Sequence, residues 1–135
     1  MSLYCYRYAV VENMRDLASS LDPTVPYFLG RRFRGFVSGG SGYLMTAATI
    51  RLLVEKGLGK KMCDKWMPKL QGRLDDLILS VCLAKLGAKF GDTRDSLGRQ
   101  KFIPFSLEDA FRNAPFTYWV KHHDLYPYKK VSCIL

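Results

Sequence analysis

The first apolar pattern in the chain is helical. Apolar residues recur at intervals of four, three and four; they are Val10, Met14, Leu17 and Leu21. This spacing places them on one face of an amphipathic helix. Asp22 ends the pattern, because a residue that precedes proline avoids the helical region of backbone space. The sequence therefore predicts a helix over residues 10–21.

A short strand is predicted next, at residues 27–30. Two further apolar segments, residues 36–37 and 43–45, flank the cluster Ser38-Gly39-Gly40-Ser41-Gly42, called the glycine cluster below. Glycines between apolar segments are typical of places where two backbones approach closely. We expect a bent strand or a hairpin at this cluster.

Two more helices are indicated by their ends. Thr46 is a good N-cap for a helix that Gly57 and Gly59 end. The apolar residues assigned to that helix are Ile50, Leu53 and Val54. The clearest helix opens at residues 74–77 and ends at Gly87, since glycine commonly follows the last helical turn.

The rest of the chain mixes short elements. We predict a strand and turn over residues 89–95, an extended segment at 101–105 and a short helix at 106–111. Helices and short strands are thus mixed, which indicates the α/β or α+β class.

The composition is that of folded protein. The chain has 135 residues, 48% hydrophobic and 24% charged, which excludes a disordered tail and allows one domain or one piece of a larger domain. The net charge is +9, and ten Lys or Arg against Glu55 and Asp64 lie between Arg31 and Arg73, so +8 belongs to this stretch. Such charge favours nucleic acid, phosphate, nucleotide-sugar or anionic lipid, without choosing among them.

The two ends lack targeting features. The first residues show no basic region followed by an apolar run, as a secretory signal would. No apolar stretch approaches the roughly 18–20 residues of a membrane span. Both ends are apolar, whereas free termini are usually polar and frayed. We therefore expect the chain to be a fragment of a larger domain.

The cysteines are widely spaced. They are Cys5, Cys63, Cys82 and Cys133. No pair has the spacing of a zinc or redox motif, and the adjacent His122 and His123 do not supply a typical zinc pair, so zinc is disfavoured. The sequence permits both buried free thiols and disulfides formed in an oxidising compartment.

Two local features are candidates for chemistry. The glycine cluster is not a phosphate-binding loop, because no Gly-Lys-Ser/Thr follows it. It is either a flexible turn or a backbone surface that a ligand approaches without meeting a side chain. Asp75 and Asp76 stand at a helix start, where the helix dipole favours ionised carboxylates by about 0.3–1 kcal/mol each. A carboxylate held there is also a candidate general base.

The basic stretch and the aromatic C-terminal region have several interpretations. The stretch is a solvated face, a phosphate-binding surface or a nucleic-acid patch. Only residues 31–34 interleave basic and aromatic side chains as RNA-binding sheets do, so nucleic acid is disfavoured. Trp119, beside Tyr118, is either part of a core or a stacking platform for a sugar ring.

An ordered set of sequence blocks resembles one enzyme family. The blocks are Glu12-Asn13-Met14-Arg15, Asp22-Pro23, Phe28-Leu29-Gly30-Arg31-Arg32-Phe33, Gly35-Phe36-Val37-Ser38-Gly39-Gly40-Ser41-Gly42-Tyr43, Asp75-Asp76-Leu77, Gly91-Asp92-Thr93-Arg94-Asp95 and Phe102-Ile103-Pro104-Phe105. In this order and spacing they resemble the core 1 β1,3-galactosyltransferases, or T-synthases, among the fringe-like β1,3-glycosyltransferases. The resemblance covers roughly residues 8–133.

The resemblance implies a fold and an activity. Residues 1–135 would form a single partial domain, the C-terminal half of an α/β GT-A type glycosyltransferase domain. Family members are Golgi type II membrane proteins that face the lumen. With a manganese ion, they transfer galactose from UDP-galactose, with inversion, to N-acetylgalactosamine (GalNAc) on Ser or Thr of glycoproteins, the core 1 step of O-glycan synthesis.

The resemblance also implies roles for individual residues. Asp76 would be the catalytic base that deprotonates the acceptor hydroxyl. Residues expected beside the substrates are Gly39, Gly40, Gly42, Tyr43, Asp75 and Trp119. Cys63 and Cys82 would form a disulfide between the basic loop and the following helix.

The chain departs from the family pattern at the residues that would bind the metal ion. The family's Asp-x-Asp motif falls at Tyr4-Cys5-Tyr6, which offers no carboxylate to a hard cation. The preceding nucleotide-binding strands and a downstream metal-ligating His have no counterpart, and Ile103 and Asp75 replace a family His and Glu. We expect no manganese ligands here and an inactive chain on its own, since the leaving diphosphate would lack a stabilising cation.

Two other functions remain open. The same family contains a chaperone without the metal motif, so this chain is alternatively a non-catalytic relative that binds an active transferase. A dedicated chaperone or a second copy of the chain are further candidate partners. A basic nucleic-acid-binding module is the other alternative, and its binding would fall steeply with salt.

Overall fold

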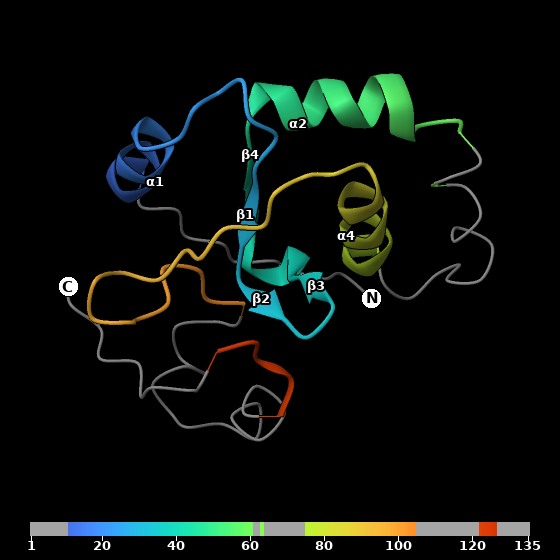
Figure 1. Ribbon diagram of the computed structural model, residues 1–135. Helices are drawn as coiled ribbons and strands as arrows, with labels where there is room; N and C mark the ends of the chain where they lie inside the picture. The colour runs from blue at the N-terminus through green and yellow to red at the C-terminus, as the bar shows by residue number, and fades with distance from the viewer. Residues whose placement is uncertain (1–10, 61–62, 64–74, 105–121, 127–135) are drawn as a thin grey trace, which may run out of the picture.

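The computed structural model describes residues 11–60, 63, 75–104 and 122–126 of the chain. Figure 1 shows a central set of short strands with α4 (Asp75–Lys85) beside them and α2 (Ala47–Leu52) along their upper end. Helix α1 (Val11–Ser19) stands to one side. The predicted mixture of helices and short strands is confirmed.

The strands form two antiparallel pairs from one continuous stretch of chain. Strand β1 (Phe28–Gly30) pairs with β4 (Tyr43–Met45), and between them β2 (Arg32–Phe33) pairs with β3 (Phe36–Val37). Residues 28–45 therefore run out along β1 and β2, turn at Gly35, and return along β3 and β4.

The return path contains four extra residues. Gly30 pairs with Tyr43, whereas Arg32, two residues further on, pairs with Val37, six residues further back. The surplus of four matches residues 39–42, which leave the ladder as the short 3-10 helix η1 (Gly39–Ser41) and Gly42. Of the two expectations for the glycine cluster, the bent strand is confirmed. A hairpin between the segments that flank the cluster is wrong, because β3 and β4 each pair with an earlier strand.

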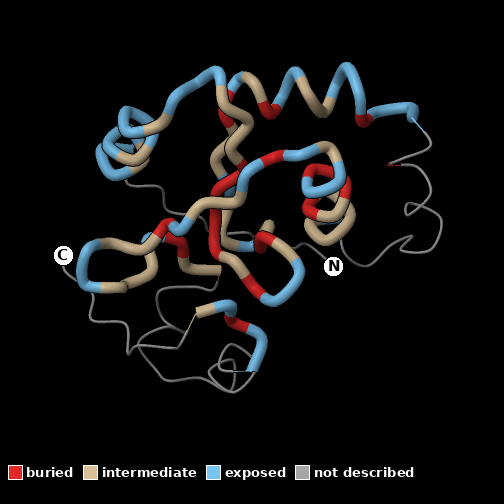
Figure 2. Tube along the Cα trace, viewed as in Figure 1, coloured by how far each residue is buried: buried red, intermediate tan, exposed pale blue. Residues whose placement is uncertain are grey.

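The core lies between β1, β3 and α4. Its buried residues are Phe28, Val37, Leu83 and Ala88, with Met45, Leu52, Leu53, Leu79 and Phe90 packed against them. Figure 2 shows this buried zone running along β1 and the side of α4 that faces the strands. Phe28 makes edge-to-face contacts with Tyr43 and Phe90, at ring-centroid distances of 5.3 and 5.5 Å.

Helix α2 begins where predicted but turns a different face inward. Thr46 holds the N-cap position, yet its hydroxyl donates to the Val25 carbonyl instead of capping the helix. Thr49 is fully buried, and its hydroxyl donates to the Tyr27 carbonyl at 2.7 Å. Ile50 and Val54, which the apolar pattern assigned to this helix, are exposed. The hydroxyl bonds to the start of β1 therefore orient this helix.

The end of α2 passes into a π-helical turn, η2 (Leu53–Gly57), that contacts α4. A Cβ placed on Gly57 would lie 3.0 Å from Leu86 Cδ1 and 3.4 Å from Cys63 Sγ. Gly57 therefore allows η2 to approach α4 closely. Its place at the end of the helix is as predicted.

Helix α4 has the predicted ends. Asp75 and Asp76 occupy its first turn, and Gly87 follows it with a φ of 90°, a conformation that glycine adopts without strain. Cys82 is joined to Cys63 by a disulfide bond. This confirms the pairing that the family resemblance implied; Cys5 and Cys133 lie outside the described residues.

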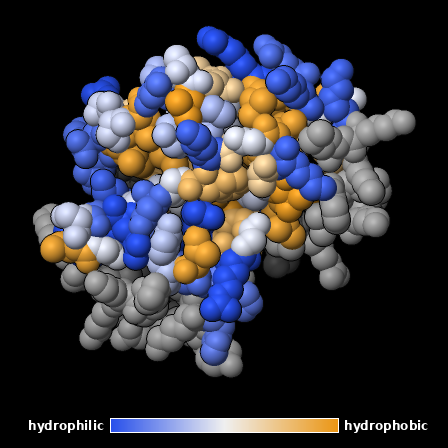
Figure 3. All heavy atoms as spheres, in the orientation of Figure 1, coloured by the Kyte–Doolittle hydropathy of each residue, from blue (hydrophilic) through white to orange (hydrophobic). Residues whose placement is uncertain are grey.

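Helix α1 is confirmed as an element but buries none of its residues. Val11, at its start, is 48% exposed. Figure 3 shows hydrophobic side chains interspersed with hydrophilic ones on the upper part of the molecule. No helix within the described ranges is both long and apolar enough to cross a membrane.

Candidate functional site

The glycine cluster is anchored to the strands before it forms a turn. Ser38 is buried, and its amide donates to the Arg31 carbonyl at 2.9 Å, which continues the β2–β3 ladder by one bond. The Ser41 hydroxyl donates to the Ser38 carbonyl, and the Gly42 amide donates to the Gly39 carbonyl. The cluster is therefore a turn closed by its own hydrogen bonds.

Asp76 is bonded directly to this turn. The Gly39 amide donates to Asp76 Oδ2 at 2.9 Å, across 37 residues of sequence. Asp76 is half-buried at the second position of α4, where the helix N-terminus favours a carboxylate. Asp75, one residue earlier, is exposed. The structure thus brings the predicted base and the predicted donor-side turn into contact.

Packing explains two of the glycines. A Cβ on Gly39 would lie 3.3 Å from Asp76 Cβ, and one on Gly40 would lie 3.2 Å from the Pro104 carbonyl oxygen. Both distances are tight for real side chains, so the turn fits between α4 and Pro104 because these side chains are absent. Close approach of other parts of the protein is therefore one reason for glycine at these two positions.

Gly42 has a different reason to be glycine. Its φ is 73°, a left-handed conformation that strains other residues, and a Cβ there would meet no atom of the described residues within 4 Å. Tyr43 follows at the start of β4, 43% exposed, with its ring edge against Phe28. Among the described residues, none therefore crowds the position of a side chain at Gly42.

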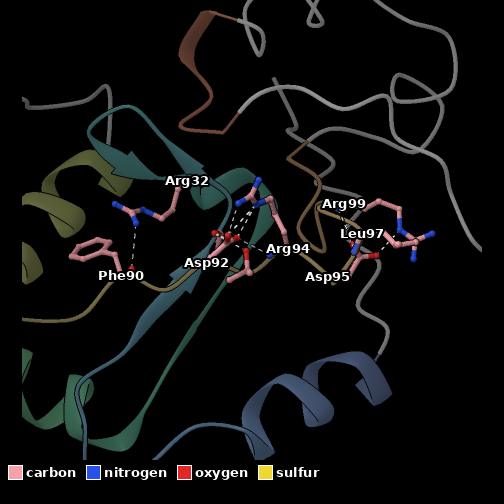
Figure 4. A network of polar contacts seen from close by, with 9 residues as sticks. Arg32, Phe90, Asp92, Arg94, Asp95, Leu97 and Arg99 are labelled. Carbon is pink, nitrogen blue, oxygen red and sulfur yellow. Dashed lines mark hydrogen bonds and ion pairs between the residues drawn. The ribbon is translucent and has the colours of Figure 1, made fainter.

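A second polar cluster lies on the segment after α4, drawn in Figure 4. The Arg94 guanidinium donates hydrogen bonds to both carboxylate oxygens of Asp92. Its central carbon lies over the Tyr126 ring, 3.8 Å from the ring centroid. The side-chain hydrogen bonds from Arg94 lower the pKa of Asp92. Arg32 bonds the Phe90 carbonyl and lies over the Phe90 ring. These contacts join the family-like block 91–95 to its neighbours.

The next turn of this segment closes on Asp95 (Figure 4). Asp95 accepts the amides of Leu97 and Arg99 and pairs with the Arg99 side chain. Hydrogen bonds, that from the Arg99 amide first, lower the pKa of Asp95. The turn was predicted at residues 91–95, but it lies further along the chain, between Asp95 and Arg99, and Arg94 forms a bridge with Gln100 across it.

Arg31 is buried and does not belong to a basic surface. It is 3% exposed and forms an ion pair with Asp124, which is 5% exposed. Asp124 lies on a segment that adds to the edge of β2, where the Leu125 amide donates to the Arg32 carbonyl. The expectation that the whole stretch 31–73 forms a charged surface is therefore wrong at its first residue.

Several predicted features lie outside the described residues. Trp119 is one, and so are the Tyr4-Cys5-Tyr6 segment and most of the basic loop, of which Cys63 is described. Within the described part of the chain, no three His, Cys, Asp or Glu side chains gather as a metal site.

Sequence reasoning missed two residues that build the site. Ser80, 1% exposed, bonds both β3 and α4, and Pro104 supports the turn at Gly40. The spacing of four residues between Asp76 and Ser80 was the available signal, because it places both on one helix face.

Comparison with known proteins gives a distant relationship. No protein-family profile matches the chain. The chain is 28% identical over 122 residues to Glycoprotein-N-acetylgalactosamine 3-beta-galactosyltransferase 1 of Xenopus laevis. The match covers 83% of this chain and 32% of that protein, so the chain spans about a third of the relative's length. The chain is thus distantly related to the galactosyltransferases.

Proposed function

We propose that this chain carries the catalytic-base side of a galactosyltransferase site, which transfers galactose from UDP-galactose to GalNAc on Ser or Thr. The observation that supports this most directly is the hydrogen bond from the Gly39 amide to Asp76 Oδ2. It joins two sequence blocks that both belong to the family resemblance. The distant relationship to a galactosyltransferase supports the same class of reaction.

In the proposed reaction, Asp76 acts as the general base. Its carboxylate takes the proton from the acceptor hydroxyl of GalNAc, and the resulting oxygen forms a bond to the anomeric carbon of galactose. The bond from that carbon to the diphosphate breaks on the opposite side, and UDP leaves with the electron pair. The Gly39 amide holds Oδ2 and the Leu77 amide holds Oδ1, so the two amides together fix the direction of the side chain.

The remaining site residues are assigned by resemblance. Gly42 and Tyr43 would face the donor sugar, an assignment supported by the position at Gly42 that no described residue crowds. Asp75 and Trp119 would lie near the substrates, with Trp119 stacking on the acceptor sugar. The Cys63–Cys82 disulfide supports a lumenal, Golgi location, because such bonds form in oxidising compartments.

The described residues do not fit a manganese site. They contain no group of three His, Cys, Asp or Glu side chains placed to hold a metal ion. Manganese ligands, which the family resemblance implies, would have to come from other residues. The roles proposed for Asp76 and Gly39 do not depend on a metal ion.

Acceptor binding tests the proposal on the chain itself. We expect the 135-residue chain to bind a GalNAc-bearing peptide more tightly than the same peptide without sugar, as measured by calorimetry. Equal affinity for the two peptides would count against an acceptor site. With UDP-galactose and manganese, this chain alone should give no robust transfer, and robust turnover would overturn the expectation that it lacks its metal ligands.

Asp76→Asn tests the base. In a longer form that contains an Asp-x-Asp motif, it should abolish transfer and leave UDP binding intact. Asp16→Asn, on the exposed face of α1, is the matched control and should keep full transfer. Retained turnover in Asp76→Asn would remove Asp76 as the base. Co-purification with an active transferase, without GalNAc binding, would instead favour the non-catalytic alternative.

A further inference from the structure

Three consecutive amides after β2 point alternately to the two sides of the chain. The amides of Val37 and Gly39 donate toward α4, to Ser80 Oγ and Asp76 Oδ2, each at 2.9 Å. The Ser38 amide between them donates the other way, to the Arg31 carbonyl. This is the alternation of an extended backbone, so β3 and the start of the turn present two amides to one helix.

The two acceptors on α4 have a matching separation. Asp76 and Ser80 are four residues apart, which puts them on one helix face about 6 Å apart along the axis. Two residues of extended chain cover about 6.6 Å, so the amides of Val37 and Gly39 meet the two side chains one to one. These two hydrogen bonds therefore set the position of α4 along β3.

Ser80 makes the more deeply buried of these two contacts between α4 and β3. Its hydroxyl is both acceptor and donor: it receives the Val37 amide and donates to the Asp76 carbonyl at 2.7 Å. Ser80 and Val37 are 1% and 0% exposed, so water does not replace a lost partner at either group. Asp76, one turn earlier, is half-buried at the open end of the same contact.

We propose that Ser80 is a positioning residue for Asp76, which sets the register of α4 on β3 and so holds the carboxylate against the Gly39 amide. A buried side chain without a hydroxyl at this position leaves the Val37 amide unpaired, and α4 shifts along the strand to relieve it. The carboxylate then leaves Gly39. Relevance to catalysis rests on the proposed function, whereas the geometry is testable without it.

Amide hydrogen exchange of Gly39, followed by NMR, is the deciding measurement. In Ser80→Ala we expect Gly39 to exchange about tenfold faster, because its hydrogen bond opens more often. Asp76→Ala should speed the amide exchange of Gly39 in the same way and leave the Val37 amide protected from exchange. Thr49→Val is the matched control: it removes another buried hydroxyl, bonded to the Tyr27 carbonyl, and should leave Gly39 unchanged.

The conservative variant completes the test. Ser80→Thr keeps the hydroxyl and should protect Gly39 as the native chain does, and it decides the question if Ser80→Ala does not fold. Unchanged exchange in Ser80→Ala, equal acceleration in Thr49→Val, or loss of Gly39 protection in a folded Ser80→Thr would overturn the positioning role.

Transfer assays separate this proposal from the proposed function. In a form that transfers galactose, Ser80→Ala should lower kcat roughly 10- to 100-fold with an unchanged KM for UDP-galactose, and Ser80→Thr should restore it. If Asp76→Asn stays active, the assignment of Asp76 as the base is wrong. The hydrogen exchange of Gly39 still tests the positioning role of Ser80 independently.

Discussion

Gly39 and Asp76 are separated by 37 residues in sequence and joined by one hydrogen bond of 2.9 Å, at a turn where a Cβ on Gly39 would crowd Asp76. The contact links the turn after β3 to the first turn of α4. Local packing and the candidate chemistry therefore depend on the same pair.

Gly39→Ala should displace the Asp76 carboxylate. Its Cβ would lie 3.3 Å from Asp76 Cβ, and we expect a loss of about 1–3 kcal/mol in the free energy of unfolding. Urea denaturation measures the loss, and the GalNAc-peptide binding assay measures the site. Gly98→Ala is the control for destabilisation remote from Asp76, because Gly98 has a φ of 76° in the separate Asp95–Arg99 turn. If both variants weaken binding equally, the effect is not specific to Asp76.

The buried ion pair between Arg31 and Asp124 should show strong coupling. Arg31→Leu leaves the Asp124 carboxylate buried without its cation, at an expected cost of about 3–5 kcal/mol. Among the described residues, Arg31 Nε and Asp124 Oδ1 have no hydrogen-bond partner, so the pair is incompletely compensated there. Replacing both by Leu should therefore cost less than either single change, as a double-mutant cycle of unfolding free energies would show. Additive losses would contradict this.

Removal of the Cys63–Cys82 bond should destabilise the fold. The bond closes a loop of 19 residues, for which chain entropy predicts about 3 kcal/mol. The Cys63→Ala/Cys82→Ala variant should therefore unfold at lower urea than the native chain. Adding a reductant should lower the midpoint of the native chain and leave that of the double variant unchanged. A native midpoint that does not respond to reductant would contradict the prediction.

Stability should fall in acid through Asp92 and Asp95. Hydrogen bonds from Arg94 and from the Arg99 amide lower their pKa values in the folded chain, and unfolding returns them to about 3.9. The folded state gains stability from these carboxylates above about pH 4 and loses it as the pH falls through their folded pKa values. Urea midpoints of the native chain and Asp95→Asn should differ at pH 7 and converge near pH 2. A constant difference would exclude this origin.

Local signals were sufficient for α4. Its first-turn carboxylates and its closing glycine, Gly87, act within a few residues, and both ends lie where the sequence places them. The inward face of α2 was not predictable in this way. The Thr49 hydroxyl donates a hydrogen bond to the Tyr27 carbonyl, 22 residues earlier, and the apolar pattern contains no information about that partner.

The candidate site was predicted in part, and through resemblance more than through spacing. The resemblance put Asp76 and the glycine cluster at one site, and the structure bonds them, although their roles stay predictions. Ser80 was missed because its importance comes from the register between a strand and a helix. The disulfide was likewise implied by the family, since cysteine spacing alone left free thiols equally open.

The pairing of Arg31 with Asp124 has a consequence for synthesis on the ribosome. Residues 28–45 emerge early and can form both strand pairs, but Arg31 has no carboxylate to meet until 93 further residues have been added. A nascent chain shorter than this has the Arg31 guanidinium between β1 and β2 without its Asp124 partner, so the guanidinium stays hydrated. Burial of Arg31, and the bridge that Asp124 forms at the edge of β2, therefore follow the arrival of residue 124.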